Sequence, residues 1–132
     1  MASDQLNQAT ALLALDRVDE VFPLLRVLAS SVTDYSDPDL TCAVIEVTAC
    51  TAAAIGDHRR AVRLAALAEA QRVLHSFPLD DLDVAFLDRQ LAVSRTALGE
   101  DLAEAEAEGR AMTVADAFAE AALLVNAKQA QP

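Results

Sequence analysis

Aromatic and helix-breaking residues are scarce in this chain. Phe, Tyr and Trp together make up 4% of its 132 residues, with no tryptophan, and there are only three glycines and four prolines. Alanine has the highest intrinsic helix propensity and contributes much of the 54% hydrophobic content. No stretch alternates for long in the manner of a strand. These features predict an all-α protein, and the length suits one domain over residues 1–132.

Cysteines and long apolar runs are scarce as well. Cys42 and Cys50 are too few for a disulfide framework, and on one helix they would lie about 12 Å apart along the axis, too far to bridge. We expect buried free thiols, which suit a reducing cytoplasm. No run of about 18 uncharged apolar residues predicts a membrane span, and residues 1–8 do not resemble a signal peptide. The expected location is cytoplasmic.

Positive charge is also in short supply, with 10 lysines and arginines against 21 acidic residues and a net charge of −11. Such a surface repels nucleic-acid backbones and anionic membranes, so neither is an expected partner. No glycine precedes a lysine, which excludes the GxxxxGK[ST] phosphate loop. No Ser-His-Asp or Cys-His pattern supports nucleophilic catalysis. We therefore predict a protein that has no catalytic residues and needs no cofactor.

The centre of the chain, residues 40–74, has the pattern of two long helices joined at Gly56 and Asp57. Apolar residues recur at helical spacing on both sides of this point. Glycine adopts the left-handed conformation that ends a helix without strain, and an aspartate after it suits the N-cap of the next helix. Small residues such as Ala61 and Ala68 would let the two helices pack closely.

Helical periodicity continues on both sides of this hairpin. Pro23 predicts a bend or a late start in the second helix because it removes a backbone donor. Gly109 is expected to end the sixth helix, and Thr113 with Asp116 is close to a capping box for the seventh. Turns at intervals of about 40 residues indicate three stacked helix pairs. The predicted helices span residues 4–15, 17–32, 38–55, 57–75, 82–98, 100–108 and 113–128.

The hairpin resembles a tetratricopeptide-type (TPR) repeat, in which small residues recur at the packed positions and a Gly-Asp turn joins the helices. From there to Ala122, and most clearly in LGE at 98–100 and EGR at 108–110 followed by Thr113, the chain resembles the end of the helical-repeat region in large bacterial ATP-dependent LuxR-type transcriptional regulators. The resemblance implies a TPR-like stack of about seven helices in antiparallel hairpins. The chain would be a fragment of such a regulator or a free-standing relative of its sensor region.

Arg59, Arg60 and Arg63 form the only dense positive patch in the sequence, at the beginning of the fourth predicted helix. Guanidinium groups there could bind a carboxylate or phosphate in forked geometry. The alternative is a solvated face whose arginines pair with neighbouring acids, with Arg72 on Glu69, and such exposed pairs contribute little.

Glu46 is the least expected charge in the chain because apolar residues surround it. It forms an i, i+4, i+8 series with Cys42 and Cys50, but zinc-binding cysteines usually lie two to four residues apart, so we predict no metal site. Glu46 is instead expected to face a groove or another helix. An acidic cluster at the beginning of the fifth predicted helix is like the acid set of a glycosidase or a metal site. Its position gives a simpler account, because acids there suit the positive end of the helix dipole. Its members are Asp80, Asp81 and Asp83.

The sequence thus predicts a non-enzymatic recognition module that binds a protein, a peptide or a small effector, as the resemblance to a sensor region implies. The alternative is a small helical enzyme or ligand carrier whose site forms at a dimer interface, and the sequence is compatible with a homodimer. A continuous open groove would favour the first hypothesis. A large apolar cavity lined by the helix at 42–55 would favour the second.

Overall fold

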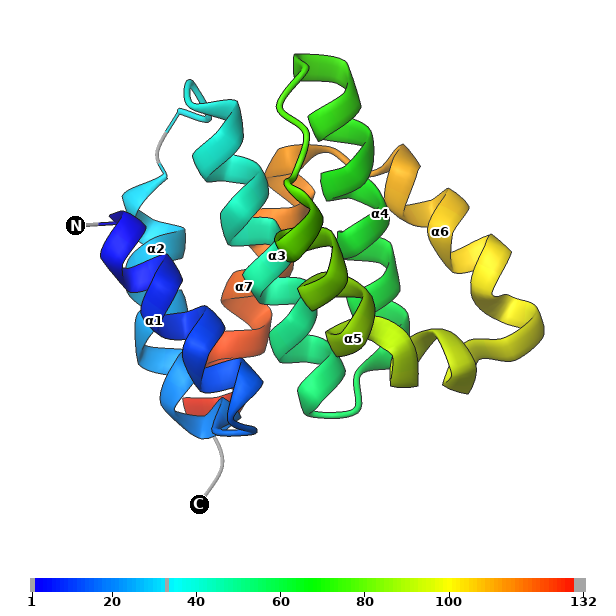
Figure 1. Ribbon diagram of the computed structural model, residues 1–132, viewed down its shortest axis with the longest axis horizontal. Helices are drawn as coiled ribbons and strands as arrows, with labels where there is room; N and C mark the ends of the chain where they lie inside the picture. The colour runs from blue at the N-terminus through cyan, green and yellow to red at the C-terminus, as the bar shows by residue number, and fades with distance from the viewer. Residues whose placement is uncertain (1, 33, 130–132) are drawn as a thin grey trace.

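A computed structural model of the chain describes residues 2–32 and 34–129, and throughout these residues the regular structure is helical (Figure 1). None of the described helices combines the length and apolar character needed to cross a membrane. The prediction of an all-α fold is confirmed. The elements are α1 (Ala2–Ala14), the 3-10 turn η1 (Val18–Glu20), α2 (Val21–Ser31), α3 (Pro38–Ala54), α4 (His58–His75), α5 (Asp81–Leu98), the 3-10 turn η2 (Gly99–Asp101), α6 (Leu102–Ala111) and α7 (Val114–Gln129).

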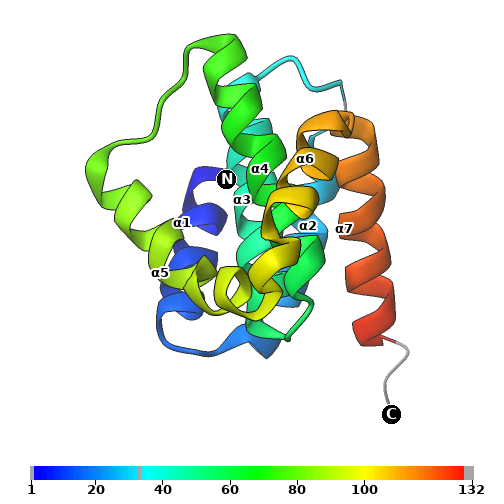
Figure 2. The same ribbon diagram turned by 90° about the vertical axis from the view of Figure 1, so that its right-hand side faces the viewer.

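Helix α3 is the centre of the fold. Every residue from Thr41 to Ala53 is buried except Ala43, which is partly covered. Helix α4 packs along it, α1 and α5 cover one face of this pair, and α7 packs against α2 and α3 on the other (Figures 1 and 2). A helix that is apolar nearly all round is expected to be enclosed in this way.

The α3–α4 hairpin forms where the sequence predicted it. Gly56 has a φ of +86°, and Ala61 and Ala68 are buried in the contact between the helices. Asp57 follows as expected, but its side chain does not cap α4. Its carboxylate instead lies 2.8 Å from the guanidinium group of Arg60. Asp57 is thus the N-cap residue of α4, as predicted, but it makes no side-chain capping hydrogen bond, and its carboxylate pairs with Arg60 instead.

Pro23 delays the beginning of the second helix. The chain first makes η1, and α2 then begins at Val21, so that Pro23 is its third residue. Backbone N–H groups in the first turn of a helix have no partner within the helix, so the donor that proline lacks is not missed there. The predicted helix at 17–32 is thus a 3-10 turn followed by an α-helix that ends at Ser31.

The third expected helix pair does not form a packed hairpin. Helix α5 ends at Leu98, Gly99 has a φ of +53°, and η2 leads into α6. Helices α5 and α6 then lie on different sides of α4, so that α6 packs on α4 and α5 packs on both α3 and α4, rather than on each other (Figure 2). The divergence leaves part of α5 uncovered on the side that faces α4.

Gly109 does not end α6. The helix continues to Ala111, and Gly109 is buried inside it. A Cβ atom at this position would lie 2.0 Å from the carbonyl oxygen of Arg63 on α4. The glycine is therefore needed for close contact between two helices, and the expected boundary at 108 is wrong by three residues.

The capping box before α7 is present. The hydroxyl of Thr113 accepts a hydrogen bond from the backbone N–H of Asp116, and the carboxylate of Asp116 accepts one from the backbone N–H of Thr113, both at 3.0 Å. We expect Thr113→Ala to lower the free energy of unfolding by about 1 kcal/mol. Urea denaturation measures this loss, and Thr113→Ser, which keeps the hydroxyl, should recover most of it. Equal losses in both variants would contradict the cap.

Thr41 carries a buried hydroxyl for which the described residues offer no hydrogen-bond partner. Because valine has the same shape without the polar group, Thr41→Val should raise the free energy of unfolding by about 1 kcal/mol. Thr48→Val is the matched control, since the Thr48 hydroxyl donates to the carbonyl of Val44 at 2.8 Å and its removal should bring no gain. Urea denaturation of the two variants tests the difference, and equal effects would contradict it.

Candidate functional site

A cleft of about 790 Å³ lies between α4 and α5. Its walls are one stripe from each helix, since the lining positions on α4 recur at i, i+4, i+7 and i+8 and those on α5 at i, i+3, i+4, i+7 and i+11. We call it the α4–α5 cleft. The α4 stripe consists of Ala65, Glu69, Arg72 and Val73, and the α5 stripe of Val84, Leu87, Asp88, Leu91 and Arg95; Glu46 of α3 also lines the cleft.

Both ends of the cleft are fixed by local hydrogen bonds. At one end, Nδ1 of His58 lies 2.8 Å from the hydroxyl of Ser94, which joins α4 to α5. At the other, Ser76 ends α4 in the left-handed conformation, and residues 76–80, the α4–α5 connector, lead to Asp80. The carboxylate of Asp80 accepts a hydrogen bond of 2.8 Å from the backbone N–H of Asp83, which caps α5. The two helices lie farther apart at the connector than at the other end (Figure 2).

A buried ion pair lies at the base of the cleft. Nε and Nη2 of Arg72 donate to the two carboxylate oxygens of Glu46 at 2.6 and 2.7 Å, and both side chains are at least nine-tenths buried. Nη1 of Arg72 donates to Asp39 and to the carbonyl oxygen of Phe77, each at 2.9 Å. One guanidinium group thus joins α3, α4 and the connector.

The pKa of Glu46 is raised by burial, which outweighs the lowering effect of the two hydrogen bonds from Arg72. The pKa of Arg72 is raised as well, chiefly by its hydrogen bond to Glu46. The predicted pairing of Arg72 with Glu69 is wrong. Arg72 turns toward α3, where a carboxylate removed from water needs a counter-charge. Glu46 lines the α4–α5 cleft and pairs with a side chain of another helix.

Glu69 therefore remains on the α4 wall as a carboxylate with no ion pair among the described residues. The other acidic groups of the lining are neutralised. Glu46 is paired with Arg72, and Asp88 accepts a hydrogen bond of 3.1 Å from Arg95. The cleft thus combines an apolar surface with one exposed negative charge.

The predicted arginine patch contacts the chain's own carboxylates. Arg59 pairs with Glu108 of α6 through hydrogen bonds of 2.5 and 3.2 Å. Arg60 lies 3.1 Å from Glu120 of α7, and Arg63 pairs with the same carboxylate. These contacts fasten α6 and α7 to α4. The arginines pair with acids, as the alternative predicted, but Arg60 and Arg63 are partly buried between helices and do not form a solvated face. Anion binding by these three residues stays a prediction.

The two cysteines are buried and unbridged, as expected. Burial raises the pKa of Cys42 to about 11 and that of Cys50 to about 12, so neither is a thiolate at neutral pH. Among the described residues no group of three or more His, Cys, Asp or Glu side chains is arranged to hold a metal ion. The thiols therefore contribute to the core as small apolar groups.

A second cleft, of about 460 Å³, lies on the other side of α5 against α1 and α3. It shares Glu46 and Arg72 with the α4–α5 cleft, but acids dominate its polar groups, including Asp39, Asp80 and Asp83. The pKa of Asp83 is raised by burial and by the neighbouring Asp80. The hypothesis of an enzyme or carrier requires a large apolar cavity lined by α3. This cleft is lined by α3, but it is smaller than the α4–α5 cleft and rich in acids.

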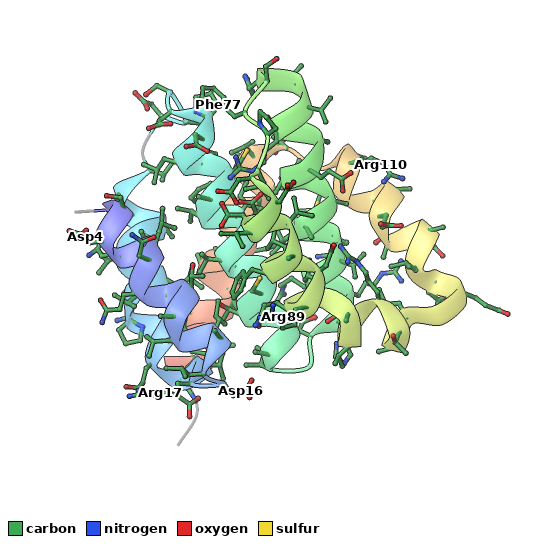
Figure 3. The ribbon with its side chains drawn as sticks, in the orientation of Figure 1. Asp4, Asp16, Arg17, Phe77, Arg89 and Arg110 are labelled. Carbon is green, nitrogen blue, oxygen red and sulfur yellow. The ribbon has the colours of Figure 1, made fainter. Side chains whose placement is uncertain are left out.

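An exposed apolar patch adjoins the α4–α5 cleft and was missed from the sequence. Its side chains are between 43% and 82% exposed, and Figure 3 shows Phe77 at the top of the view, near the beginning of α3 and the end of α4. Several of these residues recur at helical spacing, so the sequence suggested that they are buried. Spacing alone could not show that no other element covers them. Single exposed apolar residues are ordinary, but two members of this group, Val73 and Val84, also line the cleft. The patch comprises Val73, Leu74, Phe77, Leu82 and Val84.

No protein-family model, curated protein or solved structure matches the chain. The site must therefore be interpreted from its own geometry and chemistry.

Proposed function

We propose that this chain is a non-enzymatic, TPR-like recognition module that binds its partner in the α4–α5 cleft. The observation that carries the proposal is the pair of facing stripes from two helices, with an apolar surface, a buried ion pair at the base and an exposed carboxylate on one wall. Binding sites are typically concave and mostly apolar, with a few polar groups that orient the ligand. The recognition hypothesis expects an open groove, and an open cleft between two helices supports it.

The relation to LuxR-type regulators rests on the sequence resemblance alone. The structure gives its motif residues packing roles, because Glu108 pairs with Arg59, Gly109 lies against the backbone of Arg63, and Thr113 caps α7. Because these motif residues have packing roles, their resemblance suggests that the last helices of this chain and of the regulators pack in the same way. We propose on that basis that the chain is related to the sensor region of a transcriptional regulator.

The proposal is tested by partner capture with two matched variants of α5. Val84 lines the cleft and is 43% exposed, whereas Val93 lies outside the lining and is 66% exposed. The chain is immobilised as wild type, Val84→Asp and Val93→Asp, and proteins from the source cell are identified by mass spectrometry. The expected result is a partner that is retained by Val93→Asp and lost with Val84→Asp. A set of partners that Val84→Asp leaves unchanged would contradict binding in this cleft.

A further inference from the structure

The chemistry of the α4–α5 cleft defines its occupant more narrowly, and this inference rests on the function proposed above. We infer that the cleft binds an amphipathic helical segment of another protein, with apolar side chains against α5 and one lysine or arginine paired with Glu69. Three features lead to this assignment: the dimensions of the walls, their apolar surface and the charge that remains on them.

The dimensions of the walls match a short helix. The α4 stripe runs from Ala65 to Val73 and the α5 stripe from Val84 to Arg95, which correspond to about 12 and 16 Å at a rise of 1.5 Å per residue. Three turns of an added helix would be about 16 Å long. Peptide helices commonly lie in apolar grooves between helices and contact them through side chains at i, i+3 or i+4, and i+7.

The apolar surface is continuous from the base of the cleft to its rim. Leu91 is 1% exposed and forms the base, Leu87 is half-buried, and Val84 and Val73 are exposed at the rim. Phe77 of the connector is a further exposed apolar side chain near the end of α4. An apolar face on the partner would cover the side chains of the cleft and remove them from water.

The remaining charge selects a cationic group. Arg72 is held by Glu46 in a buried pair, and the charge of Arg95 is offset by Asp88, so the cleft presents no unpaired cation to an acidic partner. Among the acids of the lining, Glu69 is the one without an ion pair to the described residues. The chain as a whole has a net charge of −11. A basic segment would be steered toward this surface, whereas an acidic one would be repelled.

The test uses a phage-displayed library of random peptides of about 12 residues, or roughly three helical turns, selected on the full chain. The expected peptides carry apolar residues at helical spacing and a lysine or arginine, and Val84→Asp abolishes their binding. Glu69→Gln should weaken the recovered peptide about two- to fivefold, as for an exposed ion pair, and a rise in salt should remove that difference. Glu100→Gln is the matched control, because Glu100 lies outside the lining and the net charge changes equally.

The other outcomes separate the two proposals. Cleft-dependent peptides without a basic residue, or peptides that bind Glu69→Gln as tightly as wild type, would overturn the inference and leave the proposed function standing. Failure to recover any peptide that is sensitive to Val84→Asp would overturn both. Sedimentation velocity of the chain alone tests whether a second copy of the chain fills the cleft. A dimer that Val84→Asp dissociates would show this and would overturn the choice of another protein as the partner.

Discussion

Replacement of Arg72 by methionine should lower the free energy of unfolding by about 3–5 kcal/mol, because it leaves the carboxylate of Glu46 buried without a counter-charge. Two hydrogen bonds to Glu46 are lost, together with the contacts to Asp39 and to the carbonyl of Phe77 that hold the connector. Methionine keeps much of the apolar volume of arginine, so the loss reports mainly on charge and hydrogen bonding. Urea denaturation of the purified variant measures it.

Two controls identify the cause of this loss. Arg95→Met removes an exposed pair with Asp88 and should change stability by less than about 1 kcal/mol. The double variant Glu46→Gln/Arg72→Met removes both charges and should recover much of the loss, because replacement of a whole buried pair costs far less than removal of one partner. A double variant as unstable as Arg72→Met would show that packing of the arginine, and not the unpaired carboxylate, is responsible.

The loss in Arg72→Met should also depend on pH. In the wild type, burial raises the pKa of Glu46 and Arg72 lowers it, and the effect of burial is the larger. Without Arg72 the lowering effect is lost, so the pKa of Glu46 should rise further. A carboxyl whose pKa is higher in the folded state than in the unfolded state favours folding once it is protonated, and this contribution is lost as the pH rises through the folded-state pKa. The deficit relative to wild type should therefore be largest above the raised folded-state pKa of Glu46 and should shrink as the pH falls through that pKa toward the ordinary glutamate value of 4.5. A constant deficit would contradict the assignment.

The arrangement of Arg72 illustrates what the sequence could not determine. The sequence identified Glu46 as an unusual charge, because that judgement needs only its apolar neighbours on α3. The choice of partner depends on distance in space, and Glu46 is 26 residues from Arg72 whereas Glu69 is one turn away on the same helix. Desolvation decides between them, since an unpaired buried carboxylate is far costlier than an exposed one. The carboxylate of Glu46 becomes buried only when the neighbouring helices pack around α3, and the sequence does not show this packing.

The fold shows the same limit at the level of helices. The α3–α4 hairpin was predictable because Gly56 and the small residues at the contact are local signals. The course of α6 was not, because the local pattern of α5 and α6 is equally compatible with a packed hairpin and with two helices on different sides of α4. This difference determines the site, since the α4–α5 cleft exists only where α6 does not cover α5. The apolar positions of α5 therefore predicted a helix correctly but assigned too many side chains to the core.

Gly109→Ala provides the sharpest test of how α6 packs. In an ordinary helix interior this substitution stabilises a protein by about 0.5–1 kcal/mol, because alanine has the higher helix propensity. Here the added Cβ would meet three backbone atoms of Arg63: the carbonyl oxygen at 2.0 Å, the carbonyl carbon at 2.7 Å and the Cα at 2.8 Å. Backbone atoms cannot rotate away as side chains can, so α6 must move off α4.

The displacement of α6 should lower the free energy of unfolding by about 3 kcal/mol, toward the upper end of the cost of overpacking, because it also separates Glu108 from Arg59. Urea denaturation gives the magnitude, and Ala107→Gly, at an exposed position of the same helix, is the control that should show the ordinary loss of about 1 kcal/mol. A gain in stability for Gly109→Ala would contradict the close contact between α6 and α4. A loss of only about 1–2 kcal/mol would instead fit a left-handed glycine at the end of a helix, as the sequence alone had indicated. The three interpretations of one glycine thus differ in sign or in size, and a single denaturation curve distinguishes among them.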